Sequence, residues 1–517
     1  MKVHDFLERA ARDHPDRTAV VHLDDKFTYR DLYGKYRALA AFLDGLELAP
    51  GARVALLWDN SFEYVMAFFA VFRAGYVLVP LDTSVKPDKL ADIIADCGAE
   101  ALLCQSKFRR HLDRILPEST TVRHLISDRA LKPGREAIAV GTLADILDND
   151  AYRHDGQLPG AAVTFDPAAA RHDLAAIFYT SGSTGTSKGV MLSHRNLVSN
   201  TEATVEYLRL TPADSVIVIL PFYYIYGNSL LLTHVACGGA LVVDNRFMYP
   251  EVILDTMERE RVTGFSGVPS NFMILLNNST FTTRTFENLR YFTQAGGAMA
   301  PEVIRRLIDA FPDKEICIMY GQTEAAPRAT YCPPERLREK LGSIGIPVPG
   351  VTIKIMNDRG DELPPGESGE IIVIGDNVML GYWNQPEEQA QVLRDGRLFT
   401  GDLGKMDDDG YFYVIGRKKE IIKCGGNRVS AKEVEERILE NEKVSEAAVF
   451  GVADPLLGEA IKVAVVLKNG CRSGPKEIQD FCREKLAIHK VPKYVEFLDE
   501  LPKYQSGKVN KLQLAKR

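Results

Sequence analysis

Short apolar runs alternate with longer amphipathic stretches through the first two thirds of the chain. Residues 54–58 and 76–79 are predicted to be buried strands, the second ended by Pro80, and residues 61–72 between them are predicted to be an amphipathic helix. This alternation predicts a parallel sheet covered by helices. Further strands are expected at 101–104, 121–126, 175–178, 216–220, 241–243 and 316–320, and further helices at 195–209 and 301–311.

Near residue 350 the pattern changes to short strands separated by turn residues. Strands are expected at 352–356 and 370–374, with turns at 358–360 and 364–366. This spacing indicates a small antiparallel β unit.

A second change begins near residue 416, with a basic turn followed by two helices. The first helix, at 430–441, has Ser430 as its N-cap and Glu433 three residues on, which is the spacing of a capping box. A last helix is expected at 476–486. This portion has the length of a small α+β domain, which is commonly about 100 residues.

The length of 517 residues is too great for one hydrophobic core, so at least two domains are expected. We predict a mixed α/β and α+β fold. Its large N-terminal domain, residues 1–416, contains parallel sheets and the small β unit, and its small, mobile C-terminal domain covers residues 417–517.

Composition narrows the class of protein further. A formal net charge of −7 argues against general affinity for nucleic acid or anionic membranes. The longest apolar run, residues 64–72, is too short for a membrane span, and the first residues lack a signal-peptide core. Eight scattered cysteines without a C-x-x-C pair are typical of buried free thiols in reducing cytoplasm. The expectation is a cytoplasmic monomer or homodimer.

The stretch 179–190 has the composition of a phosphate-binding loop, because it is rich in Gly, Ser and Thr and follows the predicted strand 175–178. A flexible linker is the alternative, although linkers seldom lie between two apolar runs. The stretch is not a Walker A loop, since the residue before Lys188 is Ser187 and the residue after it is Gly189.

Two further clusters follow predicted strands or turns. Residues 320–324, Tyr-Gly-Gln-Thr-Glu, come at the end of the strand 316–320, where ligands of open α/β sheets bind. A tyrosine there can stack on a base and a glutamate can hold Mg²⁺, but a helix-starting turn is also open. Thr400-Gly401-Asp402 is predicted as a turn whose carboxylate could accept from ribose hydroxyls, and a plain β-turn is its alternative.

Two basic clusters lie toward the C-terminus. Residues 416–426 combine a run of cations with Ile421-Ile422 and a Gly-Gly turn, which a solvated linker would not need. Residues 501–509 place Lys508 behind a glycine on an expected exposed loop, where a lysine is ordinarily only solubilising.

Taken in order, these clusters closely resemble the adenylate-forming superfamily, which includes acyl-CoA synthetases, the adenylation domains of peptide synthetases and firefly luciferases. Each motif alone is moderate evidence, and the ordered set is strong. The resemblance runs through 179–190, 320–324, 400–402, 416–423 and 505–508, with further matches at 28–32, Lys86, 366–370 and 381–383.

The resemblance implies that a carboxylic acid reacts with ATP to give an acyl-adenylate and pyrophosphate, and that the acyl group then passes to a thiol. The β- and γ-phosphates would be held by Thr180, Ser181, Gly182, Ser183, Thr184, Gly185 and Lys188. Mg²⁺ would be held by Thr184 and Glu324. The adenine would lie against Gly296, Gly297, Ala298 and Tyr320, with Gly321 and Thr323 beside it, and the ribose against Asp402 and Arg417.

The resemblance also assigns roles in the small domain. Lys508 would bridge the carboxylate and the α-phosphate in the first half-reaction, and Lys419 matches the hinge about which the small domain rotates. Rotation would bring the face carrying Lys423, Gly425 and Gly426 to the site for thioester formation, because paired glycines permit close approach of a pantetheine arm. Lys188, Glu324, Lys423 and Lys508 are the expected catalytic residues.

The expected acid pocket favours an apolar acid. The pocket is expected to include Phe222, Tyr223, Tyr224, Ser266, Val268, Ala295 and Gly296. Tyrosines stand where many fatty acyl and aryl relatives have a histidine, and no acidic residue in 222–227 could bind an α-ammonium group. A fatty or aromatic acid is therefore expected rather than an α-amino acid, and glycines at 296 and 297 favour an alkyl tail.

The thiol acceptor stays open between two kinds of partner. Cys424 replaces the small hydroxyl residue common in acyl-CoA synthetases, and Asn427-Arg428 replaces a frequent Glu-Asn pair, with an arginine more usual in relatives that load carrier proteins. Coenzyme A is the favoured acceptor, and the phosphopantetheine of an acyl carrier protein is the alternative. A nucleotide-binding protein without catalysis is a third reading, disfavoured because every expected catalytic position holds the expected residue type.

Overall fold

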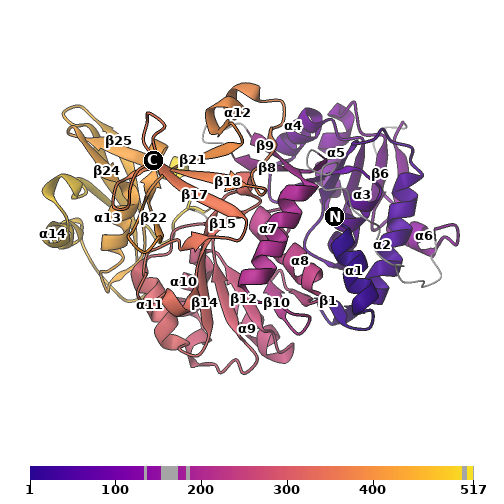
Figure 1. Cartoon of the computed structure of the whole chain (residues 1–517), viewed down its shortest axis with the longest axis horizontal. Coiled ribbons are helices and arrows are strands. Elements are labelled where there is room, and N and C mark those ends of the chain that lie inside the picture. Colours follow the sequence, from indigo (N-terminus) through magenta and orange to yellow (C-terminus); the bar gives the residue numbers. More distant parts are fainter. Residues whose placement is uncertain (133–136, 153–172, 182–186, 504–508, 516–517) are drawn as a thin grey trace.

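The computed structural model describes residues 1–132, 137–152, 173–181, 187–503 and 509–515 (Figure 1). Two large sheets, a smaller antiparallel sheet and a separate C-terminal sheet follow one another along the chain. The predicted mixed α/β fold with a smaller C-terminal domain is confirmed. The predicted boundary between residues 416 and 417 stays a prediction.

The first large sheet has eight strands in the order β19-β9-β8-β4-β3-β5-β6-β7. It is parallel from β8 to β7 and antiparallel where β9 joins β8 and β19. Its strands are β3 (Arg53–Leu57), β4 (Val77–Pro80), β5 (Ala101–Cys104), β6 (His124–Ser127), β7 (Ala139–Thr142), β8 (Leu174–Ser181), β9 (Ser187–Ser193) and β19 (Gly381–Tyr382). The accompanying helices are α2 (Tyr29–Asp44), α3 (Phe62–Arg73), α4 (Pro87–Cys97), α5 (Arg109–Glu118) and α6 (Leu143–Asp148).

The second large sheet has nine strands in the order β16-β15-β14-β13-β12-β10-β11-β1-β2, and is parallel from β1 to β14. Its strands are β1 (Thr18–His22), β2 (Asp25–Thr28), β10 (Ser215–Val218), β11 (Ala240–Val243), β12 (Gly264–Gly267), β13 (Tyr291–Gln294), β14 (Glu315–Gly321), β15 (Arg328–Cys332) and β16 (Ile346–Pro347). Its helices are α1 (Asp5–Asp13), α7 (His194–Tyr207), α8 (Ile225–Cys237), α9 (Pro250–Arg259), α10 (Pro269–Asn278) and α11 (Pro301–Ala310).

One hydrophobic core joins the two large sheets through the helices between them. Helix α3 is buried on all sides, with every residue from Tyr64 to Phe72 buried. The helix predicted at 61–72 is therefore present, but the prediction that it is amphipathic is wrong. It packs between two layers, and no face of it is exposed to water. Ser61 caps it by accepting from the Tyr64 amide.

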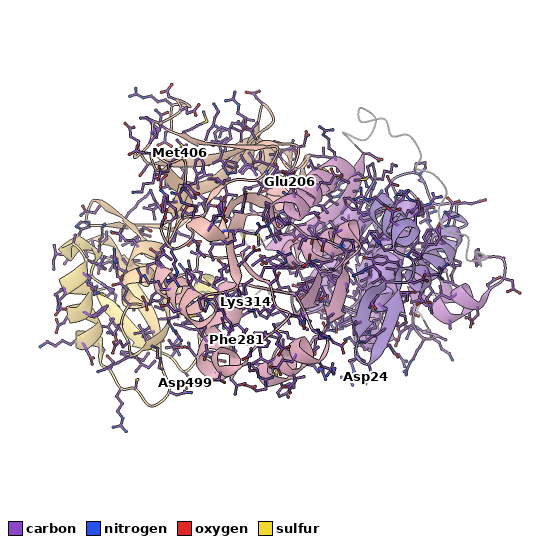
Figure 2. All side chains as sticks on the ribbon, turned by 60° about the horizontal axis from the view of Figure 1, so that its bottom comes forward. Asp24, Glu206, Phe281, Lys314, Met406 and Asp499 are labelled. Carbon is purple, nitrogen blue, oxygen red and sulfur yellow. The ribbon has the colours of Figure 1, made fainter. Side chains whose placement is uncertain are left out.

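A second core covers the opposite face of the nine-stranded sheet and contains a cluster of phenylalanines among aliphatic side chains. Phe281, labelled in Figure 2, lies against Phe265, Phe286, Phe292 and Phe311, with ring centroids between 4.6 and 6.5 Å apart. Rings in tilted and edge-on contact fill such a layer densely. The sheet is thus buried on both faces, as parallel sheets are.

The small β unit predicted near residue 350 is an antiparallel sheet of β17 (Val351–Met356), β18 (Gly369–Gly375), β20 (Leu393–Arg394), β21 (Arg397–Met406) and β22 (Phe412–Arg417), with α12 (Pro386–Val392) beside it. The predicted turn at Thr400-Gly401-Asp402 is wrong. These residues lie inside β21, where Gly401 has φ +73° and bends the strand without ending it.

The C-terminal sheet contains β23 (Ile421–Cys424), β24 (Asn427–Ser430), β25 (Val444–Asp454), β26 (Gly458–Leu467) and β27 (Tyr494–Phe497), with helices α13 (Ala431–Ile438), α14 (Pro475–Lys485) and α15 (Lys511–Ala515). Ser430 caps α13 by accepting from the Glu433 amide at 3.2 Å. The predicted capping box is only half formed, because the Glu433 carboxylate accepts from Lys490 instead.

The cysteines are free thiols and most of them are buried, as predicted. In the described part of the chain, no helix has both the length and the apolar character needed to cross a bilayer.

Candidate active site

The predicted phosphate loop connects two strands of an antiparallel hairpin. Strand β8 ends with Thr180 and Ser181, and β9 begins with Ser187 and Lys188, with Thr180 paired to Lys188 across the ladder. Lys188 is thereby fixed by backbone pairing at the end of the loop, with its side chain mostly buried. The remaining expected loop ligands, Gly182, Ser183, Thr184 and Gly185, lie outside the described residues.

Residues 381–383, which matched a family motif but were assigned no role from the sequence, pair with this hairpin. The Trp383 amide donates to the Gly189 carbonyl at 2.7 Å, and Tyr382 pairs with Val190 in β19. A Cβ at Gly189 would lie 2.9 Å from Ile177 Cγ2, which is closer than real contacts allow. A glycine is therefore needed after Lys188, because a larger residue would collide with Ile177 and crowd Trp383.

Two side chains, Glu388 and Tyr382, contact Lys188. Its ammonium forms an ion pair with Glu388 of α12 and lies 5.1 Å from the ring centroid of Tyr382. The hydrogen bond from Lys188 keeps the pKa of Glu388 below its usual value. The Tyr382 hydroxyl in turn donates to Glu324 Oε1 at 2.7 Å, and burial followed by this carboxylate raises the pKa of Tyr382. Tyr382 thus contacts Lys188 through its ring and Glu324 through its hydroxyl.

The residues predicted for the ribose are also brought together. Asp402 and Arg417 are paired neighbours on β21 and β22, with Arg417 Nε 2.9 Å from Asp402 Oδ1. The Tyr320 hydroxyl donates to Asp402 Oδ2 at 2.6 Å. The charge of Asp402 raises the pKa of Arg417, and burial followed by Asp402 raises the pKa of Tyr320. Glu370 accepts from the Gly401 amide at 3.0 Å and so fixes the bend beside Asp402.

Buried asparagine amides hold the segment between Glu324 and β15. Asn200 donates to the Arg328 carbonyl at 2.8 Å, and Asn377 donates to the carbonyls of Ala325 at 3.0 Å and Arg328 at 2.9 Å. Gly321 and Thr323 lie in β14 and in a short 3-10 turn at Thr323–Ala325. Glu324 is therefore held in place by its backbone as well as by Tyr382.

Several residues of the expected acid pocket lie near Gly296. A Cβ at Gly296, where φ is +84°, would lie 3.0 Å from Val268 Cγ1, 3.6 Å from Tyr224 Oη and 4.0 Å from Tyr226 Cδ1. Ser266 Oγ lies 2.7 Å from Thr293 Oγ1, on neighbouring strands. Val268 and the two tyrosines therefore pack closely around Gly296, and a side chain at this position would crowd Val268.

The other expected pocket and adenine residues make the following contacts. The Phe222 ring packs against Tyr64 with centroids 5.2 Å apart, and burial followed by the charge of Asp82 raises the pKa of Tyr223. The Ala295 amide donates to the Gly267 carbonyl at 3.4 Å. Gly297 accepts from Gln294 Nε2 at 2.9 Å, and both Gly297 and Ala298 are exposed. The expected roles of all the pocket and adenine residues remain predictions.

The C-terminal elements place the proposed hinge and the glycine turn on the surface. Lys419 lies in the 3-10 turn Lys418–Glu420 between β22 and β23. Gly425 and Gly426 have φ +55° and +79° and close the β23–β24 hairpin, and Lys423 is exposed on β23. Cys424 faces the small domain's core. Lys508 lies outside the described residues.

Two family models match the chain. Residues 7–383 match the model of the AMP-binding enzyme family, and residues 433–508 match the AMP-binding enzyme C-terminal domain. The chain belongs to the AMP-binding enzyme family. It is accordingly a member of the adenylate-forming superfamily and an AMP-forming acid–thiol ligase, as the sequence predicted.

Relatives of this AMP-binding enzyme are similar over nearly their whole length. A long-chain-fatty-acid–CoA ligase of Yersinia pestis is 35% identical over 531 residues, covering 99% of this chain and 93% of the relative. A feruloyl-CoA synthase of Amycolatopsis is 33% identical, covering 98% and 97%. An anthranilate CoA ligase structure with anthranoyl-AMP has a TM-score of 0.89 at 26% identity, covering 99% and 96%. These relatives support acyl-CoA ligase activity.

Several residues that organise this AMP-binding enzyme's site were not predicted from the sequence. Tyr382 and Glu370 belong to motifs that were recognised only as resemblances. Glu388 and Asn377 carried no sequence signal, because a glutamate at a helix start and an asparagine near a turn are ordinary. Only the three-dimensional pairing of β9 with β19 and of β18 with β21 shows what they contact.

Proposed function

We propose that this protein activates an apolar carboxylic acid, fatty or aryl, with ATP and transfers the acyl group from the adenylate to coenzyme A. The observation that carries the proposal is that Tyr320 and Glu324, four residues apart, contact the two groups of residues expected at opposite ends of the nucleotide. Tyr320 contacts Asp402, and Glu324 contacts Tyr382 beside Lys188.

The first half-reaction brings a carboxylate to an α-phosphate, so two anions must approach each other. A fixed cation about 4 Å from a unit negative charge contributes roughly 4 kcal/mol at an effective dielectric near 20. Lys188 would stabilise the β- and γ-phosphates, and Lys508 would bridge the attacking carboxylate and the α-phosphate. The acid oxygen attacks phosphorus directly, pyrophosphate leaves, and no covalent enzyme intermediate is needed.

The chain's donor set fits ATP and Mg²⁺. Lys188 already binds a carboxylate, Glu388, as an ammonium facing anions should, and Asp402 is oriented by Tyr320 and Arg417. Glu324 and Thr184 would hold Mg²⁺, which supplies charge neutralisation at the phosphates.

An apolar acid is supported by the surroundings of Gly296. Val268 and the tyrosines at 224 and 226 lie closest to Gly296, and residues 222–227 include no acidic side chain. The relatives named above act on fatty, feruloyl and anthranilate substrates, which are consistent with an apolar body and an aromatic or alkyl framework.

The second half-reaction would follow rotation of the small domain, residues 417–517, about Lys419. The rotation removes Lys508 and presents Lys423 with Gly425 and Gly426, whose tight turn leaves room for a pantetheine arm. A carrier protein would use the same arm, so it remains the alternative acceptor, and a catalytically inactive nucleotide-binding protein remains the alternative class. We expect the enzyme to work in the cytoplasm, as a monomer or homodimer.

The test is acid-dependent exchange of labelled pyrophosphate into ATP with Mg²⁺ across fatty, aromatic and α-amino acids, followed by addition of coenzyme A. Exchange with an apolar acid and conversion to its acyl-CoA is the expected result. Exchange without use of coenzyme A would favour the carrier-protein acceptor, and no exchange with any acid would favour the nucleotide-binding alternative.

A further inference from the structure

Arg328 is a buried cation beside the acid pocket. It begins β15, immediately after the segment that carries Glu324, and is only 3% exposed. Its guanidinium carbon lies 4.3 Å from the ring centroid of Tyr226, and Nη2 donates to Ser229 Oγ at 3.0 Å. A guanidinium in such a place would ordinarily be balanced by a carboxylate.

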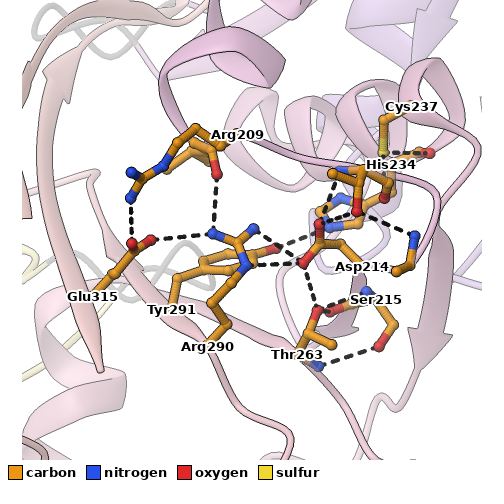
Figure 3. A network of polar contacts seen from close by, with 12 residues as sticks. Arg209, Asp214, Ser215, His234, Cys237, Thr263, Arg290, Tyr291 and Glu315 are labelled. Carbon is orange, nitrogen blue, oxygen red and sulfur yellow. Dashed lines mark hydrogen bonds and ion pairs between the residues drawn. The ribbon is translucent and has the colours of Figure 1, made fainter. Parts of the chain in front are cut away.

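Arg290, which directly precedes β13 of the same sheet, is a partly buried arginine that is paired with carboxylates (Figure 3). Its Nε and Nη2 donate to Asp214 Oδ1 at 3.1 and 3.0 Å, and Nη1 donates to Glu315 and to the Leu208 carbonyl. Within the described ranges Arg328 forms no ion pair, and its Nε is buried without a hydrogen-bond partner. Arg328 is therefore more deeply buried than Arg290, yet it has fewer hydrogen-bond partners and no carboxylate partner among the described residues.

The unpartnered Nε of Arg328 belongs to a side chain that is linked to Gly296 through Tyr226. The Tyr226 ring that Arg328 stacks on comes within 4.0 Å of a Cβ placed at Gly296, so one ring borders both groups. Asn228, next to Ser229 on α8, is fully buried, and neither its amide nitrogen nor its amide oxygen has a partner. Unsatisfied buried groups of this kind call for a ligand, because each loses its hydration without compensation.

We propose that Arg328 is a specificity-determining residue that binds an oxygen acceptor at the far end of the acid substrate. The acid then has an apolar body, one carboxylate that is adenylated, and a distal oxygen group that accepts from the guanidinium beyond Tyr226. A distal carboxylate matches the buried positive charge, and a hydroxyl or ether oxygen supplies the same acceptor without charge. This inference rests on the proposed function and refines its substrate class.

The experiment compares matched acids in pyrophosphate exchange. One series is benzoic and cinnamic acids with hydrogen, methyl, hydroxyl, methoxy or carboxylate at the para position, and another pairs alkanoic with α,ω-alkanedioic acids of equal length. Wild type should prefer an oxygen-bearing acid over its methyl analogue by roughly 10- to 100-fold in kcat/KM, the range for a hydrogen bond to a charged group. The carboxylate and the neutral oxygen arms identify which acceptor is used.

The variants separate binding from packing. In Arg328→Met the preference should fall to near one, and Arg328→Lys, which keeps the charge but loses the planar fork, should lie between. Arg336→Met is the control, since Arg336 pairs with Glu339 at the surface at 2.8 Å, and it should keep the wild-type preference. Thermal unfolding adds a second readout: Arg328→Met should melt no lower than wild type, whereas Arg290→Met should melt lower.

Two results would overturn the inference. One is an equal preference for oxygen-bearing and methyl acids in the wild type, with normal exchange, which leaves the proposed function standing. The other is an unchanged preference in Arg328→Met and Arg328→Lys. If the wild type activates no acid at all, the proposed function fails first, and this inference fails with it.

Discussion

Tyr382 donates its hydroxyl hydrogen to Glu324 at 2.7 Å, while the centroid of the same ring lies 5.1 Å from the ammonium of Lys188. One side chain therefore contacts both the cation and the carboxylate expected around the terminal phosphates. It reaches them from β19, almost 200 residues beyond Lys188, because β19 pairs with β9. The same short strand, β19, therefore both pairs with the hairpin and carries the tyrosine that contacts the two charged groups.

Removing the Tyr382 hydroxyl should misplace Glu324. Tyr382→Phe keeps the ring beside Lys188 and loses one hydrogen bond to a carboxylate, so we expect kcat/KM for MgATP to fall by about tenfold or more. Pyrophosphate exchange measures it. Tyr36→Phe is the matched control, because Tyr36 makes the same kind of bond to Glu8 at 2.8 Å far from the site. Equal losses in both variants would contradict the role given to Tyr382.

If Lys188 binds the nucleotide phosphates, its ion pair with Glu388 should compete with them. Glu388→Ala should lower the KM for ATP by up to about fivefold at low salt, the range for a partly exposed ion pair, and the effect should shrink as salt rises. Glu387→Ala, one residue away and exposed on α12, should leave KM near the wild-type value. A higher KM for ATP in Glu388→Ala would mean that Glu388 assists nucleotide binding instead.

Lys508 should matter for chemistry more than for binding. Lys508→Ala is expected to slow adenylate formation by at least about 100-fold, the scale for losing a charge-stabilising group, with ATP affinity nearly intact. Exchange kinetics and equilibrium nucleotide binding measure the two quantities. Lys503→Ala, at a nearby lysine paired with Glu446, is the control. Near-normal pyrophosphate release from Lys508→Ala would remove this lysine from the mechanism.

The glycine turn should serve the second half-reaction. Gly425→Leu or Gly426→Leu should slow thioester formation more than adenylation, since a side chain there obstructs a pantetheine arm. Both positions have positive φ, so backbone strain must be controlled. Gly470→Leu supplies that control, with φ +81° and open space around it. If adenylation and thioester formation fall equally in the turn variants, the turn does not line the thiol's path.

Stability should fall on mild acidification because of His234. Burial lowers its pKa from an ordinary value near 6.5 to about 4, and its Nε2 lies 2.9 Å from the Tyr291 hydroxyl (Figure 3). Between pH 6.5 and 4 the unfolded chain binds a proton that the folded protein excludes, so the unfolding free energy rises with pH there, by at most about 1.4 kcal/mol per pH unit.

Denaturant unfolding at several pH values measures this slope. His234→Gln should flatten the slope between pH 6.5 and 4, whereas His489→Gln, in the C-terminal part, should leave it as in the wild type. An unchanged slope in His234→Gln would assign the acid sensitivity to other groups.

Much of the fold was predictable because local patterns and tertiary structure agree. The strand expected at 101–104 is β5, and the helix expected at 301–311 is α11, which begins at Pro301 as proline favours. The turn expected at 400–402 failed because Gly401 usually marks a chain reversal, and here the Glu370 carboxylate holds it within a strand. The nature of α3 also needed the structure, since its neighbours come from two different sheets.

Only the site residues that belong to recognisable motifs could be predicted from the sequence. Asp402 and Arg417 were expected at the ribose, and the structure pairs them across β21 and β22. Arg328 and Asn228 could not be singled out, because an arginine at a strand start and an asparagine in a helix are unremarkable until burial and missing partners are known. Their importance lies in unsatisfied hydrogen bonds, which no sequence pattern records.

The cap of α13 has a consequence for domain motion. Ser430 Oγ accepts from the Glu433 amide and also donates to the Ile415 carbonyl, and Lys432 donates to the Val414 carbonyl at 2.6 Å. A turn of the small domain about Lys419 would break the bonds to Val414 and Ile415 but leave the bond to Glu433 whole. If the small domain rotates as proposed, Ser430 would release the preceding strand while still capping its own helix, so the rotation would not require either domain to unfold.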